Sequence, residues 1–242
     1  MKMKKITGII IALLLMFNVF AQDELNTITT AVPFLLIGPD ARAGAMGDVG
    51  VATTPDANSM HWNPAKLAFN ENDLGASMSF VPWLRSLVND INLSYITGYK
   101  KIGDKQAIGF ELGYFSLGQI TFTDVNGGLI GNYTPNEYVI GSAYSRKLSD
   151  DFSLSVGGKY ILSDLTGGVK AGEYETFSGR SFAADVSGFY NRPIRISGKD
   201  LDLAIGCNIS NIGSKVSYTE TSIRDFIPIN LRLGTALGAD ID

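Results

Sequence analysis

Apolar and polar residues alternate along most of the chain after residue 73, in segments of about ten residues. Residues 201–210 place apolar side chains at every second position, namely Leu201, Leu203, Ile205, Cys207 and Ile209. The same alternation runs through residues 74–80, 91–100, 106–115, 118–124, 136–147, 152–162, 180–191 and 228–238. Side chains alternate between the faces of a β-strand, and a tilted strand needs about ten residues to cross a membrane. The pattern therefore predicts an all-β chain with about nine strands.

The two faces of these strands differ in character. The apolar face carries aromatic residues near strand ends, at Tyr95, Tyr99, Tyr114, Tyr138, Tyr144, Tyr160 and Tyr190. The opposite face holds Asn92, Ser94, Glu111, Ser155, Lys159, Asp185, Asp202, Asn208, Asn230 and Arg232. A water-filled lumen accepts such side chains, whereas the core of a secreted β-sandwich, the alternative fold, does not. We therefore predict a transmembrane antiparallel β-barrel with aromatic girdles.

The connections between the predicted strands fall into two lengths. Short turns at 103–104 and 149–151 alternate with longer connections at 124–136, 164–180 and 211–227. Membrane barrels have short turns on the inner side of the membrane and long loops outside.

The first residues have the features of an export signal. Lys2, Lys4 and Lys5 precede an apolar run from Ile9 to Phe17, and Ala21 suits cleavage by a signal peptidase. The run is too short for a comfortable transmembrane helix. We therefore expect residues 1–21 to be a cleaved signal peptide.

Charge and residue usage exclude several kinds of partner and chemistry. Residues 1–21 hold three of the 20 Lys and Arg and no acid, so without them the net charge falls from −4 to about −7. This acidic balance argues against nucleic acid as a partner. Cys207 and His61 are the only cysteine and histidine. A hydrolase that uses histidine would depend on His61 alone, and we expect no enzyme activity, no metal and no cofactor.

Residues 22–73 break the alternation and are rich in small residues. Asp56 is a candidate N-cap for a short helix that ends ahead of Pro64. We interpret this segment as a plug or lid inside the barrel, followed by barrel strands from residue 74 onward.

A known family shares the motifs of this segment. Residues 42–52, residues 56–59 and Trp62-Asn63-Pro64-Ala65 resemble the PorV/PorQ family of outer-membrane barrels of the type IX secretion system in Bacteroidetes. Asn63-Pro64-Ala65 alone is similar to FadL-type transporters. The signature residues carried over are Gly44, Gly47, Asp48, Gly50, Trp62, Asn63, Pro64 and Ala65.

The resemblance implies a FadL-like barrel of fourteen strands. Residues 74–242 offer about nine and end without a strand that closes on an aromatic residue, so we expect them to be the N-terminal part of the barrel, with the C-terminal strands missing.

The implied role is that of a carrier in the outer membrane. It would bind the C-terminal signal domain of secreted cargo and deliver it from the translocon to the cell-surface attachment complex, which includes a PorU-like sortase. The long connections are the expected contact surface. The alternative is a FadL-like channel for hydrophobic small molecules, against which the polar lumen lining argues.

Overall fold

A computed structural model describes residues 30–123, 126–169, 175–196, 198–220 and 224–239. The predicted signal peptide, residues 1–21, and the start of the predicted plug lie outside these ranges. In the described residues no helix has both the length and the apolar character needed to cross a membrane.

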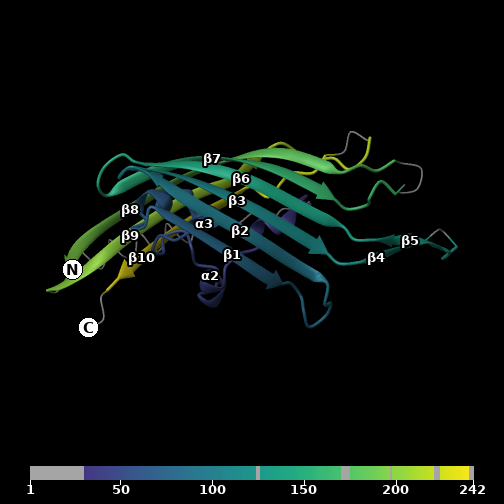
Figure 1. Ribbon diagram of the computed structural model, residues 1–242, viewed down its shortest axis with the longest axis horizontal. Helices are drawn as coiled ribbons and strands as arrows, with labels where there is room; N and C mark the ends of the chain where they lie inside the picture. Colours follow the sequence, from purple (N-terminus) through teal and green to yellow (C-terminus); the bar gives the residue numbers. More distant parts are fainter. Residues whose placement is uncertain (1–29, 124–125, 170–174, 197, 221–223, 240–242) are drawn as a thin grey trace, which may run out of the picture.

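Eight antiparallel strands form one curled sheet, in the order β1-β2-β3-β6-β7-β8-β9-β10 (Figure 1). Their bounds are β1 (Leu74–Pro82), β2 (Ile91–Ile102), β3 (Gln106–Leu117), β6 (Asn136–Lys147), β7 (Phe152–Asp164), β8 (Gly179–Ile196), β9 (Lys199–Gly213) and β10 (Asn230–Gly238). The predicted all-β, barrel-type fold is thus confirmed.

A separate hairpin extends from the sheet between β3 and β6. It consists of β4 (Ile120–Thr123) and β5 (Leu129–Tyr133), which pair with each other. The prediction of a barrel strand at 118–124 was therefore wrong in placement. Gly118 adopts a φ of +81°, and the next backbone N–H donates to the Asp90 carboxylate, so the chain turns away from the sheet after Leu117.

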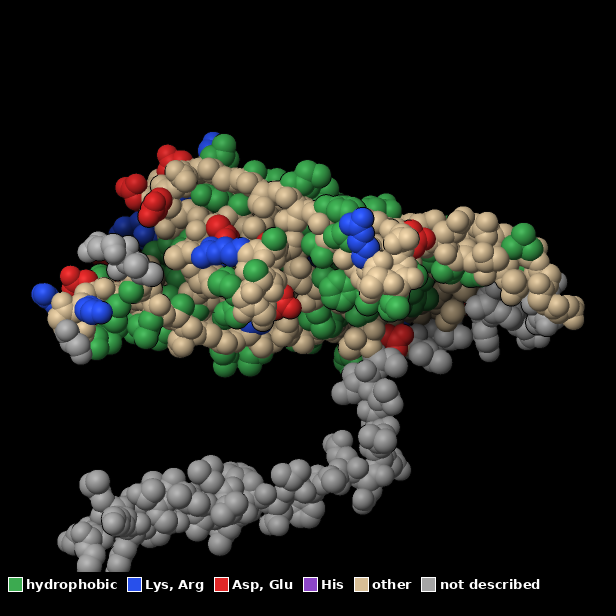
Figure 2. All heavy atoms as spheres, turned by 90° about the horizontal axis from the view of Figure 1, so that it is seen from below, with side chains coloured by type: hydrophobic (Ala, Val, Ile, Leu, Met, Phe, Trp, Pro, Cys, Tyr) green, Lys and Arg blue, Asp and Glu red, His purple; other side chains and the backbone are tan. Residues whose placement is uncertain are grey.

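Short turns and long connections lie at opposite ends of the sheet. Residues 103–105, 148–151 and 197–198 join strands at one end, and residues 83–90, 118–135, 165–178 and 214–229 join them at the other. Figure 2 shows charged side chains gathered toward the short-turn end, at its left, and hydrophobic side chains along the margins of the middle. The predicted alternation of connection lengths is confirmed.

The convex face of the sheet is apolar and exposed. It presents large side chains from every strand, including Met78, Phe110, Ile140, Val156, Phe182, Ile205 and Leu233. Five of the predicted girdle tyrosines share this face near strand ends, where Tyr114 packs on Tyr138 and Tyr160 packs on Phe182. An apolar surface of this extent marks a contact with membrane or another protein.

In β2 the predicted faces were inverted. Tyr95 and Tyr99 are buried on the concave face, opposite Gly113 and Gly109 of β3, whereas Asn92 and Ser94 are on the convex face. The register explains this, because Thr97 pairs with the buried Glu111 and sets the phase of the whole strand. The apolar side of β2 faces inward because another part of the chain packs on it.

That part is residues 31–73, which we call the docked segment. It contains η1 (Pro33–Leu36), α2 (Ala41–Ala45), α3 (Ser59–Trp62) and η2 (Pro64–Phe69). Figure 1 shows these elements within the curve of the sheet. Helix α3 begins later than predicted, with Asn58 rather than Asp56 at its N-cap position. Asp56 instead pairs with Arg42, at 3.1 Å, and accepts a hydrogen bond from the Ser59 hydroxyl.

Candidate functional site

The docked segment runs along the concave face from the long-loop end to the short-turn end. At its start, the Ala31 N–H donates to the Phe226 carbonyl at 2.9 Å, within the β9–β10 connection. Phe34 and Leu35 then enter an apolar cluster with Leu93, Phe115, Val139, Ile161, Ala183, Val216 and Ile227. At its end, the Lys101 ammonium donates to the Asn70 carbonyl at the foot of β1. The segment therefore contacts the sheet near both of its ends.

Asn63 is the centre of the docking contact. Its side-chain amide donates to the Val51 carbonyl at 2.9 Å and to the Gly188 carbonyl of β8 at 3.1 Å. Its Oδ1 accepts from the Ala65 N–H, which caps η2, and Pro64 occupies the first turn, where its missing N–H costs nothing. Asn63 is fully buried. One side chain thus joins two parts of the docked segment to the concave face of the sheet, which we call the wall.

Small hydroxyl side chains of the wall bind the backbone of this motif. The Ala65 carbonyl accepts from Ser145 of β6 at 3.1 Å and from Ser153 of β7 at 2.6 Å. The Ala65 N–H donates to Ser187 of β8 at 3.1 Å. In addition, Asn208 of β9 donates to the Trp62 carbonyl at 3.0 Å. Four neighbouring strands therefore satisfy backbone groups that burial would otherwise leave unpaired.

Trp62 fixes the earlier part of the docked segment. Its indole N–H donates to Asp40 Oδ2 at 2.6 Å, while Oδ1 of the same carboxylate caps α2 at the Ala43 N–H. Gly50 lies against the indole ring, and a Cβ there would be 2.7 Å from Cδ1 of Trp62. Only glycine fits this close approach.

Lys66 is buried and binds the same loop. Its ammonium donates to the Gly50 carbonyl at 2.8 Å and to the Thr53 hydroxyl at 3.1 Å. Burial lowers the pKa of Lys66 to about 8; the Asp56 carboxylate opposes this shift and Arg42 adds to it.

The predicted signature residues divide into two groups. Trp62, Asn63, Pro64 and Ala65 are buried at the wall and Gly50 lies against Trp62, so these five are brought together. In contrast Gly44 in α2 and Gly47 and Asp48 in the turn after it are exposed. Gly47 and Asp48 have φ values of +79° and +61°, so this part of the motif shapes the backbone after α2.

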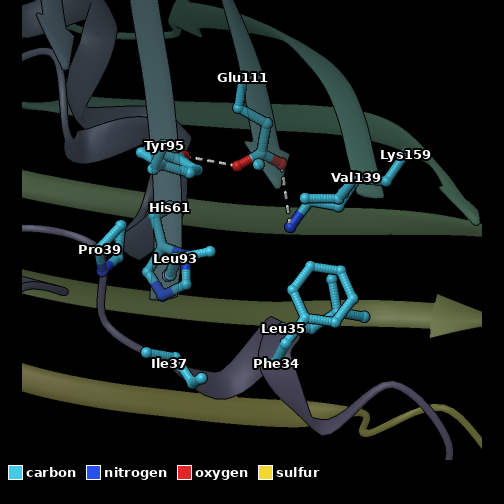
Figure 3. A pocket seen from close by; sticks show the side chains of 11 residues that line it. Phe34, Leu35, Ile37, Pro39, His61, Leu93, Tyr95, Glu111, Val139 and Lys159 are labelled. Atoms are coloured by element: carbon cyan, nitrogen blue, oxygen red, sulfur yellow. Dashed lines mark hydrogen bonds and ion pairs between the residues drawn. The ribbon is translucent and has the colours of Figure 1, made fainter. Parts of the chain in front are cut away.

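A charged cluster lies deeper on the concave face (Figure 3). Lys159 of β7 reaches Asp185 at 2.8 Å and Glu111 at 3.3 Å, and the Tyr95 hydroxyl donates to Glu111 at 2.6 Å. Each charge is buried but has an opposite charge beside it, as burial requires. The adjoining cavity, between this cluster and Phe34, has a volume of about 20 Å³, room for roughly one water molecule.

His61 lies at the edge of the cluster, inside the docked segment. Its ring packs edge-on against Trp62 and Tyr95, and its Nε2 is 3.4 Å from Arg232 of β10. Burial lowers the pKa of His61 well below 6.5, and Arg232 and Lys159 lower it further. His61 is therefore neutral at pH 7 and packs against aromatic rings near two cations, Arg232 and Lys159.

Acidification is expected to loosen the docked segment through His61. Because the docked pKa lies below that of a free histidine, docking is fully stable above pH 6.5 and loses stability as the pH falls below it, by at most about 1.4 kcal/mol per unit from this group. Limited proteolysis of the folded protein at pH 7.5 and 5.5 measures this. The variant His61→Gln should respond less to pH, and an equal response in both proteins would contradict the assignment.

Sequence reasoning missed most of the wall partners. Ser145, Ser187 and Gly206 carry no motif, and their importance follows only from the backbone that they face. Gly206 of β9 lies directly against the Val51 carbonyl. Of the predicted lumen set, Glu111, Ser155, Lys159, Asp185 and Asn208 are buried on the concave face. Small residues alternating along β6 to β9 were the available signal.

A curled antiparallel sheet with a polypeptide segment hydrogen-bonded across its concave face defines a barrel-type all-β protein. The family model described as type IX secretion system protein PorV matches residues 20–242, nearly the whole chain. The chain therefore belongs to the PorV family and is a type IX secretion system component. This family is part of a secretion system and is not a known enzyme family. No curated protein matches the chain.

Proposed function

We propose that this protein is an outer-membrane carrier of the type IX secretion system. It binds the C-terminal signal domain of secreted cargo and delivers it from the translocon to the attachment complex at the cell surface, where a PorU-like sortase completes the chemistry. The protein itself is not an enzyme and uses no cofactor.

The observation that carries the proposal is the docked segment on the concave face of the sheet. The docked segment acts as a plug, because Asn63 and Ala65 are held by β6, β7 and β8. With this segment across the concave face, the carrier would bind cargo through its outer surface. The long connections provide that surface, and the β4–β5 hairpin extends furthest (Figure 1).

Barrel closure by further strands is part of the proposal. In the described residues β1 and β10 each pair with one neighbour in the main sheet. Lipid does not tolerate unpaired strand edges, so in the membrane both edges are covered by strands of the same barrel.

The alternative is a channel for hydrophobic small molecules. The apolar cluster around Leu93, Phe115 and Val139 at the long-loop end favours it, since such a surface would bind an apolar ligand. In the docked state Phe34 and Leu35 occupy that surface. A channel therefore requires the docked segment to move, which the carrier does not.

Affinity purification tests the carrier proposal. A tagged full-length protein isolated from its native outer membrane should co-purify with secreted proteins that retain their C-terminal domain and with a sortase-like partner. Replacing residues 120–133 by a short Gly-Ser link should reduce cargo recovery, whereas a Gly-Ser insertion at 103–104, in a short turn, should not. Recovery of the protein alone, with a bound hydrophobic ligand, would support the channel.

A further inference from the structure

Three cationic side chains line one open cleft at the long-loop end of the sheet. Arg180 begins β8, and Lys215 and Arg224 lie in the two arms of the β9–β10 connection. The cleft has a volume of about 870 Å³, and hydroxyl groups complete its lining at Thr176, Ser178, Ser214 and Ser217. This chemistry fits an anionic group.

The three cations project from the convex side of the sheet. Arg180 alternates with the buried Gly179 and Ser181. Val216 is buried and pairs with Asp225 through two hydrogen bonds of 2.8 Å, so its neighbour Lys215 points outward. Lys215 indeed lies on the ring of Phe226, with Nζ 3.9 Å from the centroid. By the same alternation Arg224 shares this face.

Positive charge exceeds negative charge in the lining. Asp164 is the one acid among the described residues of the cleft, and its carboxylate accepts the Gly167 N–H at 3.0 Å. The three cations are all exposed. A phosphate, with several acceptor oxygens, would satisfy both guanidinium and ammonium donors here.

The cleft lies at the boundary of the apolar surface. Immediately below it on the convex face are Phe182, which is 71% exposed, and Ile212, which is 42% exposed. Lipid headgroups lie next to the apolar belt of a barrel, where cations attract their phosphates. The cleft therefore lies at headgroup level on the outer side of the membrane.

A separate apolar groove lies on the convex face toward the short-turn end. It has a volume of about 330 Å³ and lies over Gly188, between Leu154, Val186, Ile205, Cys207 and Ile209. The groove exists because Gly188 lacks a side chain; a Cβ there would lie 3.4 Å from Leu154 Cδ2. Arg180 and Gly188 are eight residues apart, about 26 Å along a strand, which is most of the roughly ten residues that cross a membrane, so the groove lies far from the cleft.

We propose that the cleft binds one anionic lipid, with its phosphate at Arg180, Lys215 and Arg224 and its acyl chains against the exposed Phe182 and Ile212 beside the cleft. The proposal rests on the proposed function only in that the convex face lies in the membrane. Cargo recovery by affinity purification reports on the carrier role separately.

Native mass spectrometry of the full-length protein in detergent micelles tests this site. Dimyristoyl phosphatidylglycerol should bind more tightly than dimyristoyl phosphatidylcholine. The triple variant Arg180→Gln, Lys215→Gln, Arg224→Gln should bind phosphatidylglycerol at least about tenfold more weakly, from the contribution of each cation near an anionic headgroup. The control Lys105→Gln, Arg195→Gln, Lys199→Gln removes the same charge at the short-turn end and should retain the affinity. Heat-dependent gel mobility verifies that each variant is folded.

Two further arms separate the lipid from other anions. Dihexanoyl phosphatidylglycerol should bind more weakly than the dimyristoyl lipid, because its short chains cover less of the apolar surface beside the cleft. Gly188→Leu, which fills the distant groove, should leave the affinity unchanged. Excess inorganic phosphate should compete only partly. Equal losses in the triple variant and its control, or complete displacement of the lipid by phosphate, would overturn the proposal.

Discussion

Gly206→Ala is expected to release the docked segment from the wall. The new methyl group would meet backbone, since a Cβ at this position lies directly against the Val51 carbonyl oxygen and 2.8 Å from its carbon. Backbone on both sides cannot rotate away as a side chain can, so we expect a loss of about 3 kcal/mol in docking free energy. Limited proteolysis of the folded protein should then cleave within residues 31–73.

Gly44→Ala is the matched control. A Cβ at Gly44 meets nothing within 4 Å, and the residue lies in α2, where alanine is the better helix former by about 0.5–1 kcal/mol. This variant should be at least as resistant to protease as the parent. Equal resistance of the Gly206→Ala protein would show that β9 does not support the segment in solution.

Asn63→Ala should have the second largest effect. The change removes the donor to the buried Val51 carbonyl, the donor to the part-buried Gly188 carbonyl and the cap of η2. Each unsatisfied buried group costs about 1–3 kcal/mol, so we expect about 2–4 kcal/mol in total. The thermal midpoint of the folded protein in detergent, together with protease resistance of the docked segment, measures this loss.

Asn58→Ala provides the same chemical change five residues earlier. The Oδ1 of Asn58 is buried without a hydrogen-bond partner, so its removal relieves a cost rather than breaking a contact. Its thermal midpoint should stay constant or rise. A fall comparable to that of Asn63→Ala would mean that both residues act only through helix α3.

The sequence predicted the fold where one face of a strand is apolar and the other is not. In β9 and β10 this contrast identified the convex face correctly, including Cys207 and Leu233. In β2 both faces contain apolar residues, because Leu93 packs on the docked segment, and alternation alone could not set the phase. The cross-strand pairing of Tyr95 with Gly113 places Tyr95 on the concave face and so sets the phase of β2.

The candidate site was predicted only in part. The Trp62-Asn63-Pro64-Ala65 motif was identified from its residues, and all four are buried at the wall. Its partners were not, because Ser145, Ser153 and Ser187 bind backbone groups, which carry no sequence signal of their own. Lys66 was overlooked because an isolated lysine is usually an exposed residue.

A reversible disulfide tests the central claim that the protein works with the docked segment held against the sheet. Ala65→Cys and Ser187→Cys join positions whose backbone nitrogen and hydroxyl oxygen lie 3.1 Å apart, and Cys207→Ala removes the remaining thiol. Oxidation fixes the docked segment to β8, and secretion is then assayed in cells that contain only this variant. Our account predicts that secretion continues at the level of the reduced protein. Loss of secretion on oxidation, restored by a reductant, would contradict it and show that the docked segment must move.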